Sequence, residues 1–196
     1  TSNTAFGKNA GDALTTNGNY NAIFGEDSGT AITTGDNNTG VGYGALKTSS
    51  TGSNCTAVGF EALMTSNAGE NTAVGTKALR LATGNNLTAV GYSALDVNTS
   101  GANSTAVGSG ALGQNTTGGN NTAIGYASLD ANSTASNNVA VGYFALLSNT
   151  TGASNVAVGH TSLDANTSGS DNIAMGKASL SSNTTGSNNV ALGKDA

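Results

Sequence analysis

An apolar residue followed directly by glycine recurs along the whole chain and sets its period. The apolar residues are Phe6, Phe24, Val41, Val58, Val74, Val90, Val107, Ile124, Val141, Val158, Met175 and Leu192. The glycines that follow them, called anchor glycines below, are Gly7, Gly25, Gly42, Gly59, Gly75, Gly91, Gly108, Gly125, Gly142, Gly159, Gly176 and Gly193. Their successive spacings are 18, 17, 17, 16 and 16 residues and then 17 residues six times. The spacing predicts a single tandem-repeat domain over residues 1–196.

The composition of each repeat predicts β-structure. The consensus reads Asn-Thr/Val-Ala-Val-Gly-Tyr-x-Ala-Leu followed by Asn-Thr-Thr-Gly, and about 17 residues are too few for two helices. Thr, Val and Tyr favour strands, while Asn, Thr and Gly favour turns. We therefore predict an all-β, parallel β-solenoid of about 12 coils. Each coil is expected to hold two short strands, through Thr-Ala-Val-Gly and through Ala-Leu, and strands ~4.8 Å apart give a rod ~58 Å long.

Alternation along the first strand assigns residues to faces. The apolar residue before each anchor glycine, and the Thr, Val or Ile two positions earlier, are predicted to point into the coil. Leucines of the second strand are predicted to fill the coil from the other side; they are Leu46, Leu63, Leu79, Leu95, Leu112, Leu129, Leu146, Leu163 and Leu180. The Ala column between the two inward positions would then form a smooth outer strip. Such a strip is suited to lateral packing against another copy of the chain.

Asparagine forms two further columns. One precedes the first strand and contains Asn121, Asn138, Asn155, Asn172 and Asn189. The other lies in the turn after the leucines and contains Asn98, Asn115, Asn132, Asn149, Asn166 and Asn183. In-register stacking would let each amide hydrogen-bond to the Asn above and below it, so both columns are predicted to be structural ladders.

Composition narrows the classes of function. Val, Ile, Leu and Phe together number 33 of 196 residues, so a thin fold is favoured over one with a wide core. The six basic residues are scattered through a chain of net charge -5, which argues against nucleic-acid binding. No apolar run approaches ~18 residues, so membrane insertion is not expected.

An aromatic column follows the anchor glycines and allows two interpretations. It contains Tyr43, Phe60, Tyr92, Tyr126 and Tyr143, with His160 continuing it. The rings could form a strip that stacks on sugars. Alternatively, they cover the edge of the coil and stack on one another, and we prefer this second interpretation.

Titratable residues do not cluster in the sequence. Asp96, Asp130 and Asp164 recur every 34 residues, and side chains two strand spacings apart, ~10 Å, cannot share one metal ion. Cys55 and His160 each stand alone in their columns, so no nucleophile-base pair is expected. We predict no enzymatic activity, no cofactor and no metal.

Three coils carry a family resemblance. Residues 138–142, 155–159 and 172–176 read Asn-Val-Ala-Val-Gly, Asn-Val-Ala-Val-Gly and Asn-Ile-Ala-Met-Gly. They resemble the head repeat of trimeric autotransporter adhesins, whose core motif reads Asn-Ser-Val-Ala-Ile-Gly. The longer consensus is similar to repeats of phage tail-fibre-like and bacterial surface proteins. Both resemblances imply an extracellular fibrous protein at a cell surface or on a virion, without catalysis, and the first also implies a trimer.

Together these features predict a non-enzymatic structural or adhesive segment or subunit of a surface fibre or filament. The repeat is still running at Gly193, which predicts either further sequence or head-to-tail stacking of copies. The alternative is an adhesin or tail-fibre shaft that binds a glycan or a host receptor. Ice binding ranks last, because the paired residues Thr116-Thr117, Thr150-Thr151 and Thr184-Thr185 fall in a turn and cannot share a strand face.

Overall fold

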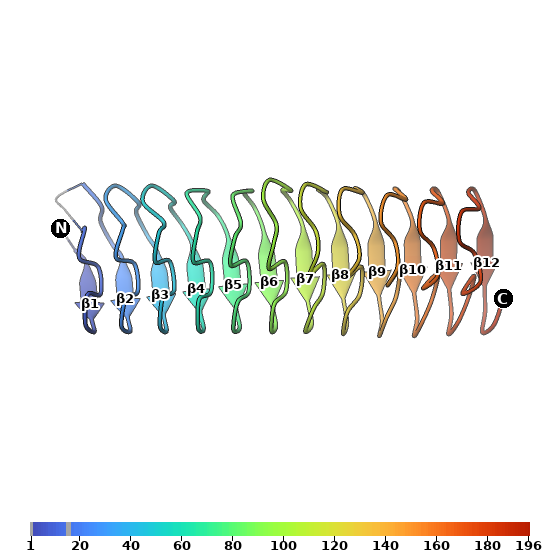
Figure 1. Cartoon of the computed structure of the whole chain (residues 1–196), viewed down its shortest axis with the longest axis horizontal. Helices are drawn as coiled ribbons and strands as arrows, with labels where there is room; N and C mark the ends of the chain where they lie inside the picture. The colour runs from blue at the N-terminus through green and yellow to red at the C-terminus, as the bar shows by residue number, and fades with distance from the viewer. Residues whose placement is uncertain (1, 15–16) are drawn as a thin grey trace.

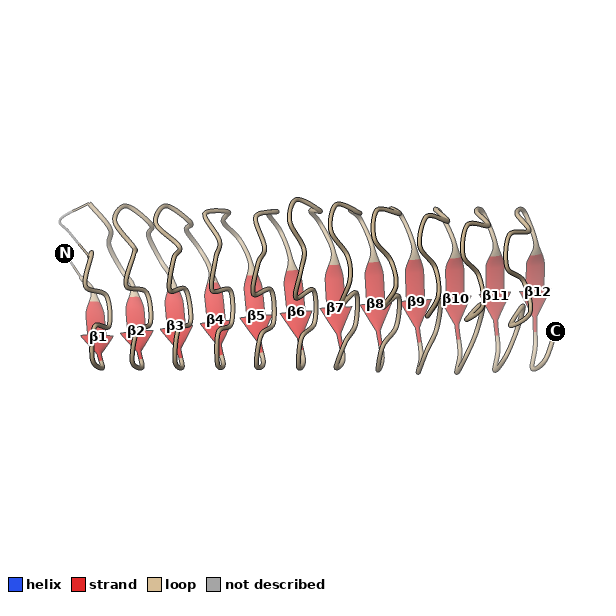
Figure 2. Ribbon diagram, viewed as in Figure 1, coloured by secondary structure: helices blue, strands red, loops and turns tan. Residues whose placement is uncertain are grey.

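The computed structural model describes residues 2–14 and 17–196, which form one column of β-strands (Figures 1 and 2). The strands are β1 (Thr4–Phe6), β2 (Ala22–Phe24), β3 (Thr39–Val41), β4 (Thr56–Val58), β5 (Thr72–Val74), β6 (Thr88–Val90), β7 (Thr105–Val107), β8 (Thr122–Ile124), β9 (Val139–Val141), β10 (Val156–Val158), β11 (Ile173–Met175) and β12 (Val190–Leu192). They form a single 12-stranded sheet in chain order, and every pair is parallel. The predicted all-β parallel solenoid is confirmed. A coil is named below by its strand.

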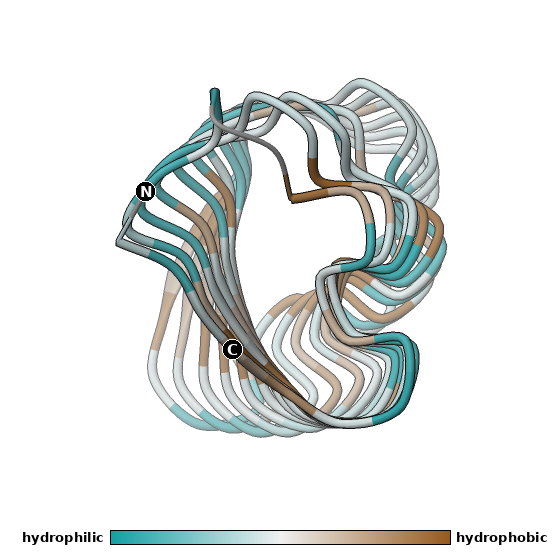
Figure 3. Cartoon of the chain, turned by 90° about the vertical axis from the view of Figure 1, so that its left-hand side faces the viewer, coloured by the Kyte–Doolittle hydropathy of each residue, from teal (hydrophilic) through white to brown (hydrophobic). Residues whose placement is uncertain are grey.

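Equivalent residues of neighbouring coils lie directly over one another. In β7 and β8, Thr105 pairs with Thr122, Ala106 with Ala123 and Val107 with Ile124. Viewed along the rod, the coils superpose with a gradual drift, so each kind of residue continues from coil to coil (Figure 3). The predicted columns therefore exist, and any side chain has its counterparts about one strand spacing, ~4.8 Å, away.

The anchor glycines cannot be replaced without moving the backbone. All twelve have φ between +124° and +142°, a region that side chains rarely adopt. At Gly42, an added Cβ would lie 2.6 Å from the Gly59 carbonyl oxygen of the next coil. Glycine therefore recurs after the apolar residue because the backbones of successive coils approach each other closely at this position.

The predicted faces of the strand are reversed in the structure. The middle residue points into the coil, since Ala57, Ala106 and Ala140 are fully buried, whereas Val74, Val90 and Ile124 before the anchor glycine are 37%, 37% and 41% exposed. The interior of so short a coil is already filled by leucine from the opposite side, which leaves room for only a methyl group on the strand. The β2 coil is consistent with this reason, because Gly29 stands where coils β3 to β11 have leucine and the buried Ile23 replaces the strand alanine; the β1 coil also has a glycine there, Gly11, but keeps Ala5.

The second predicted strand is absent from the described residues. The leucines that were to define it have φ between 47° and 57°, the left-handed helical region, and lie in turns. Their burial is nevertheless as predicted, because Leu46 through Leu163 are fully buried and Leu180 packs partly against the same core. Turns rather than a second sheet close each coil.

Candidate binding surfaces

The outward side of the sheet, called the sheet face below, is formed by the first and third residues of each strand. Its third-residue column contains the apolar residues before the anchor glycines, of which eight are exposed, from Phe6 at 75% to Leu192 at 66%, and four are half-buried: Val58, Val107, Val141 and Val158. Its first-residue column contains Thr39, Thr56, Thr72, Thr88, Thr105 and Thr122 in six consecutive coils, followed by Val139, Val156, Ile173 and Val190. No charged residue belongs to either column.

The sheet face is a long, narrow surface of mainly apolar side chains. Eleven strand spacings of ~4.8 Å make it ~53 Å long, and its columns lie ~7 Å apart, so the strip that they span covers ~370 Å². The largest apolar patch on a typical monomer covers ~300–600 Å² and often has a function. The six threonine hydroxyls make no hydrogen bond to any described residue, so they too are available to an external partner.

The aromatic column is divided into two stacked groups. Tyr43 lies on Phe60, with ring centroids 5.4 Å apart and planes 14° apart. Tyr143 lies between Tyr126 and His160, at 5.4 Å and 5.1 Å from their centroids, and Phe144 contacts the rings of Tyr126 and Tyr143. Tyr92 is 58% exposed and contacts no other ring of the described residues. Five of the six rings of the column therefore stack on a neighbour, as our preferred interpretation expects, and sugar binding by this column stays an untested prediction.

The Asn column before the strands forms a ladder between side chains and backbone. Asn138 N–H donates to Asn121 Oδ1 at 2.9 Å, and Asn155, Asn172 and Asn189 repeat this bond with the preceding Asn at 2.9–3.0 Å. Each of the first four amides also donates from Nδ2 to a turn carbonyl oxygen of the next coil, at 2.8–3.0 Å. Their oxygens and nitrogens are thus both used to hold successive turns in register.

The Asn column after the leucines forms a ladder between side chains. The Nδ2 atoms of Asn115, Asn132, Asn149, Asn166 and Asn183 donate to Oδ1 of the preceding Asn at 2.8–3.2 Å. All six amides also donate to the carbonyl oxygen three residues later, at 2.8–3.0 Å. Five of the six side chains are fully buried, and each amide links the two ends of its own turn by the bond to the carbonyl oxygen.

The aspartates of the 34-residue period do not form a common site. Asp96 pairs with Arg80, whose Nε lies 2.7 Å from its Oδ1. Burial raises the pKa of Asp130 and of Asp164, and Asp164 Oδ1 is buried without a hydrogen-bond partner in the described chain. Within residues 2–14 and 17–196, no three His, Cys, Asp or Glu side chains converge as metal ligands.

Cys55 and His160 lie far apart in the rod. Cys55 directly precedes β4 and is buried, and burial raises the pKa of its thiol. His160 follows β10, stacks on Tyr143 and has Nδ1 3.3 Å from Thr161 Oγ1. Six strand spacings separate β4 from β10, so the two residues do not form a nucleophile-base pair, which the sequence also argued against.

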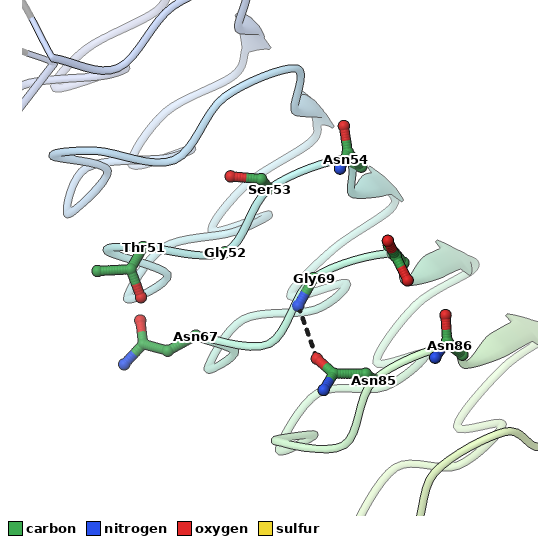
Figure 4. Close-up of a pocket in the computed structure, with 9 residues that line it drawn as sticks. Thr51, Gly52, Ser53, Asn54, Asn67, Gly69, Asn85 and Asn86 are labelled. Atoms are coloured by element: carbon green, nitrogen blue, oxygen red, sulfur yellow. Dashed lines mark hydrogen bonds between the residues drawn. The ribbon is translucent and has the colours of Figure 1, made fainter.

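A polar hollow of about 380 Å³ lies in the turns that precede β4, β5 and β6 (Figure 4). Its lining residues are Thr51, Gly52, Ser53, Asn54, Asn67, Gly69, Glu70, Asn85 and Asn86. It coincides with the two 16-residue spacings, Gly59 to Gly75 and Gly75 to Gly91, where two successive turns are each one residue short. The sequence alone did not lead us to predict this site, although the two 16-residue spacings mark its position.

No helix among the described residues is long and apolar enough to cross a membrane. No protein-family model, no curated protein and no solved structure matches the chain.

Proposed function

We propose that the chain is a non-enzymatic structural segment of an extracellular fibre, at a cell surface or on a virion, and that copies associate side by side through the sheet face. The apolar column that runs along all twelve strands, exposed in eight of them and half-buried in the other four, is the observation that supports the association. Leaving such a column in water costs free energy that burial against another copy would recover, at ~25 cal/mol per Å².

The two Asn ladders support the structural role. Backbone and side-chain hydrogen bonds link every coil to the next, and the repeat contacts only its neighbours, as in other solenoid proteins. A rod of this kind holds its length without a wide core. It is therefore suited to spacing or projecting other parts of a fibre.

A second copy fits the sheet face better than an unrelated partner. The face is uncharged, and the side chains of its columns repeat with the same spacing along the rod in every copy of the chain. The columns of two copies can therefore interdigitate over their whole length. Two faces of ~370 Å² bury ~740 Å² in total, the size of a weak interface rather than of a standard one. A self-complementary patch of this kind produces a closed symmetric oligomer.

Analytical ultracentrifugation of the whole chain and of two double variants tests the association. In Val74→Lys with Val107→Lys, two charges enter the sheet face without touching the core, and we expect the oligomer to dissociate at least tenfold more readily because buried charges need partners. In the control, Thr117→Lys with Ser168→Lys, the same two charges enter exposed turns and should leave the mass unchanged. A monomeric wild type at millimolar concentration would contradict the proposal, as would an oligomer that survives the face variant.

Ice binding is a second candidate function, because the first and third residues of each strand point outward and place the strand threonines on the surface. Thr116 lies in a turn and its Oγ1 donates to the Ser133 carbonyl oxygen, so the paired threonines stay unsuited, as the sequence analysis argued. The strand threonines, by contrast, present six free hydroxyls beside a column of methyl groups on one flat face. Thermal hysteresis measured on the same two double variants separates the candidates, since only ice binding predicts activity in the wild type and its loss in the face variant.

A further inference from the structure

The polar hollow is a break in an otherwise regular backbone ladder. In nine of the ten coils from β3 to β12, the N–H of the residue two before the strand donates to the backbone oxygen of the preceding coil; examples are Glu70 N–H to Ser53 O at 2.9 Å and Asn103 N–H to Asn85 O at 3.1 Å. The missing bond is the one between Asn86 N–H and Gly69 O. Neither group has another partner among the described residues, so both are available at the floor of the hollow.

A second backbone N–H group at the hollow, that of Ser53, also lacks a hydrogen-bond acceptor among the described residues. Asp36 N–H donates to Ser53 Oγ at 3.0 Å, and Gly69 N–H donates to Asn85 Oδ1 at 3.0 Å. Ser53 N–H lies between these two in the column, and the residue that would accept from it is Gly69, which has no side chain. The Ser53 N–H therefore also has no partner in the part of the chain that is described.

Glu70 stands in the hollow at a position that suits asparagine. In coils β2 to β12, the residue two positions before the strand has φ between 56° and 64°. In seven of these coils that residue is asparagine: Asn37, Asn54, Asn86, Asn103, Asn120, Asn137 and Asn188. Asn tolerates this left-handed conformation better than Glu does. A strained residue at a cavity is a reason to seek a functional role for it. Here it places one unpaired carboxylate among free amide groups.

We infer that this hollow binds a neutral saccharide, and the inference does not rest on lateral association because the site lies in the turns. Two backbone N–H groups, the Gly69 carbonyl, the Glu70 carboxylate and the Asn54 and Asn86 amides offer donors and acceptors side by side. A sugar hydroxyl both donates and accepts, so it can use such a mixture fully. A carboxylate forms strong hydrogen bonds to hydroxyl donors.

Charge argues against other ligands. A cation such as Ca²⁺ is held by ~6–8 oxygen ligands that include several carboxylates in tight sites, whereas the hollow has one carboxylate beside its carbonyl and amide oxygens and two N–H donors that would repel a cation. An anion would be repelled by Glu70, and no basic residue lines the hollow. The volume of about 380 Å³ lies within the range of small-ligand sites. The absence of an aromatic ring from the lining predicts millimolar affinity for a single sugar.

Amide NMR spectra of the whole chain titrated with glucose, galactose, mannose and N-acetylglucosamine test this site. We expect at least one sugar to shift the Ser53 and Asn86 amide signals. In Glu70→Asn, which suits the left-handed backbone and should fold at least as well, binding should weaken about tenfold or more, since it loses a charged hydrogen-bond acceptor.

Asp171→Asn provides the matched control. Asp171 is a carboxylate at the same position of a distant coil, with φ 57°, and lies outside the hollow. This variant should bind the sugar as the wild type does. The inference is overturned if no sugar shifts these amides, if Glu70→Asn binds unchanged, or if Ca²⁺ alone produces the same shifts.

Discussion

The amides of Asn115, Asn132 and Asn149 donate to one another along the C-terminal half of the rod, whereas the N-terminal half has no such chain. At the same position, seven residues after the anchor glycine, the earlier coils carry Leu14, Ile32, Ser49, Ser66 and Ala82. The leucine core continues through both halves, but only one half adds a buried polar ladder to it.

The ladder before the strands shows the same difference. It is continuous from Asn121 to Asn189, but Cys55, Leu87 and Ser104 interrupt it in the earlier coils. Cys55 N–H and Leu87 N–H still donate to the preceding Asn, each at 2.9 Å. Neither side chain offers an amide oxygen to the following coil.

The comparison shows why asparagine recurs at these positions. An amide both donates and accepts, so it passes a hydrogen bond on to the next coil, while an aliphatic or thiol side chain ends the chain of bonds. In a repeat protein, where stability is a sum of local terms, the half with continuous ladders should be the more stable.

The largest change in the free energy of unfolding is expected when one asparagine of the side-chain ladder is removed. Asn149→Ala removes the bonds of Asn149 Nδ2 to Gly152 O and Asn132 Oδ1, and leaves the buried Asn166 Nδ2 without its bond to Asn149 Oδ1. We expect the free energy of unfolding to fall by about 3 kcal/mol, since each bond contributes ~1 kcal/mol and a buried unsatisfied donor costs more. Urea unfolding measures the change.

Ser66→Ala is the matched variant in the N-terminal half. Ser66 Oγ contacts only the backbone of Ala68, as donor to its oxygen at 3.4 Å and acceptor from its nitrogen at 3.3 Å. Its removal should cost about 1 kcal/mol or less. Equal costs for the two substitutions would show that the Asn ladder adds no stability of its own.

A smaller effect is expected from repairing the interrupted ladder. Cys55 occupies an Asn position, and its Sγ contacts the Ala68 carbonyl oxygen at 3.5 Å, in place of the amide bond that Asn38 makes to Gly52 O at 2.8 Å. Cys55→Asn should raise the free energy of unfolding by about 1 kcal/mol, because an amide is a better donor and acceptor than a thiol. Urea unfolding under reducing conditions measures it, and a loss of stability would show that the sulphur fits this turn better than an amide.

The period and the columns could be predicted from sequence because both are properties of the repeat. Leu46 to Leu163 are buried and the Asn columns are bonded because any in-register stack places like residues together. The orientation of the strand could not be predicted, since a three-residue strand gives too little alternation to separate the two faces. Its most hydrophobic residues, such as Val90 and Ile124, lie outside because leucine already fills a narrow coil.

The hollow illustrates a different limit. The 16-residue spacings around Gly75 show where a residue is missing, but the spacing alone does not say whether neighbouring turns close over the gap. The structure answers this through the unpaired groups of Ser53, Gly69 and Asn86. Hydrogen-bond partners between coils depend on the local path of each turn, which a repeat count does not determine.

The smallest expected effect concerns pH, and it has opposite signs in the two halves. In the N-terminal half, hydrogen bonds from Lys47 and Asn9 lower the pKa of Asp27, whose Oδ2 lies 2.9 Å from Lys47 Nζ. The contribution of Asp27 is therefore present above its unfolded pKa of ~3.9 and is lost as the pH falls below that value. In the C-terminal half, no Lys or Arg occurs from residue 81 to residue 176.

Burial instead raises the pKa of Asp130 and Asp164 there, so their folded carboxyl groups favour the proton. Their contribution is fully present below ~3.9 and is lost as the pH rises through the raised values. Asp164→Asn mimics the protonated group, and it should raise stability at pH 7 and flatten the change between pH ~4 and 7. Asp27→Asn should lower stability at pH 7 and reduce the acid loss below pH ~4. Urea unfolding from pH 3 to 7 measures both, and an unchanged profile in Asp164→Asn would show that its buried oxygen reaches water in solution.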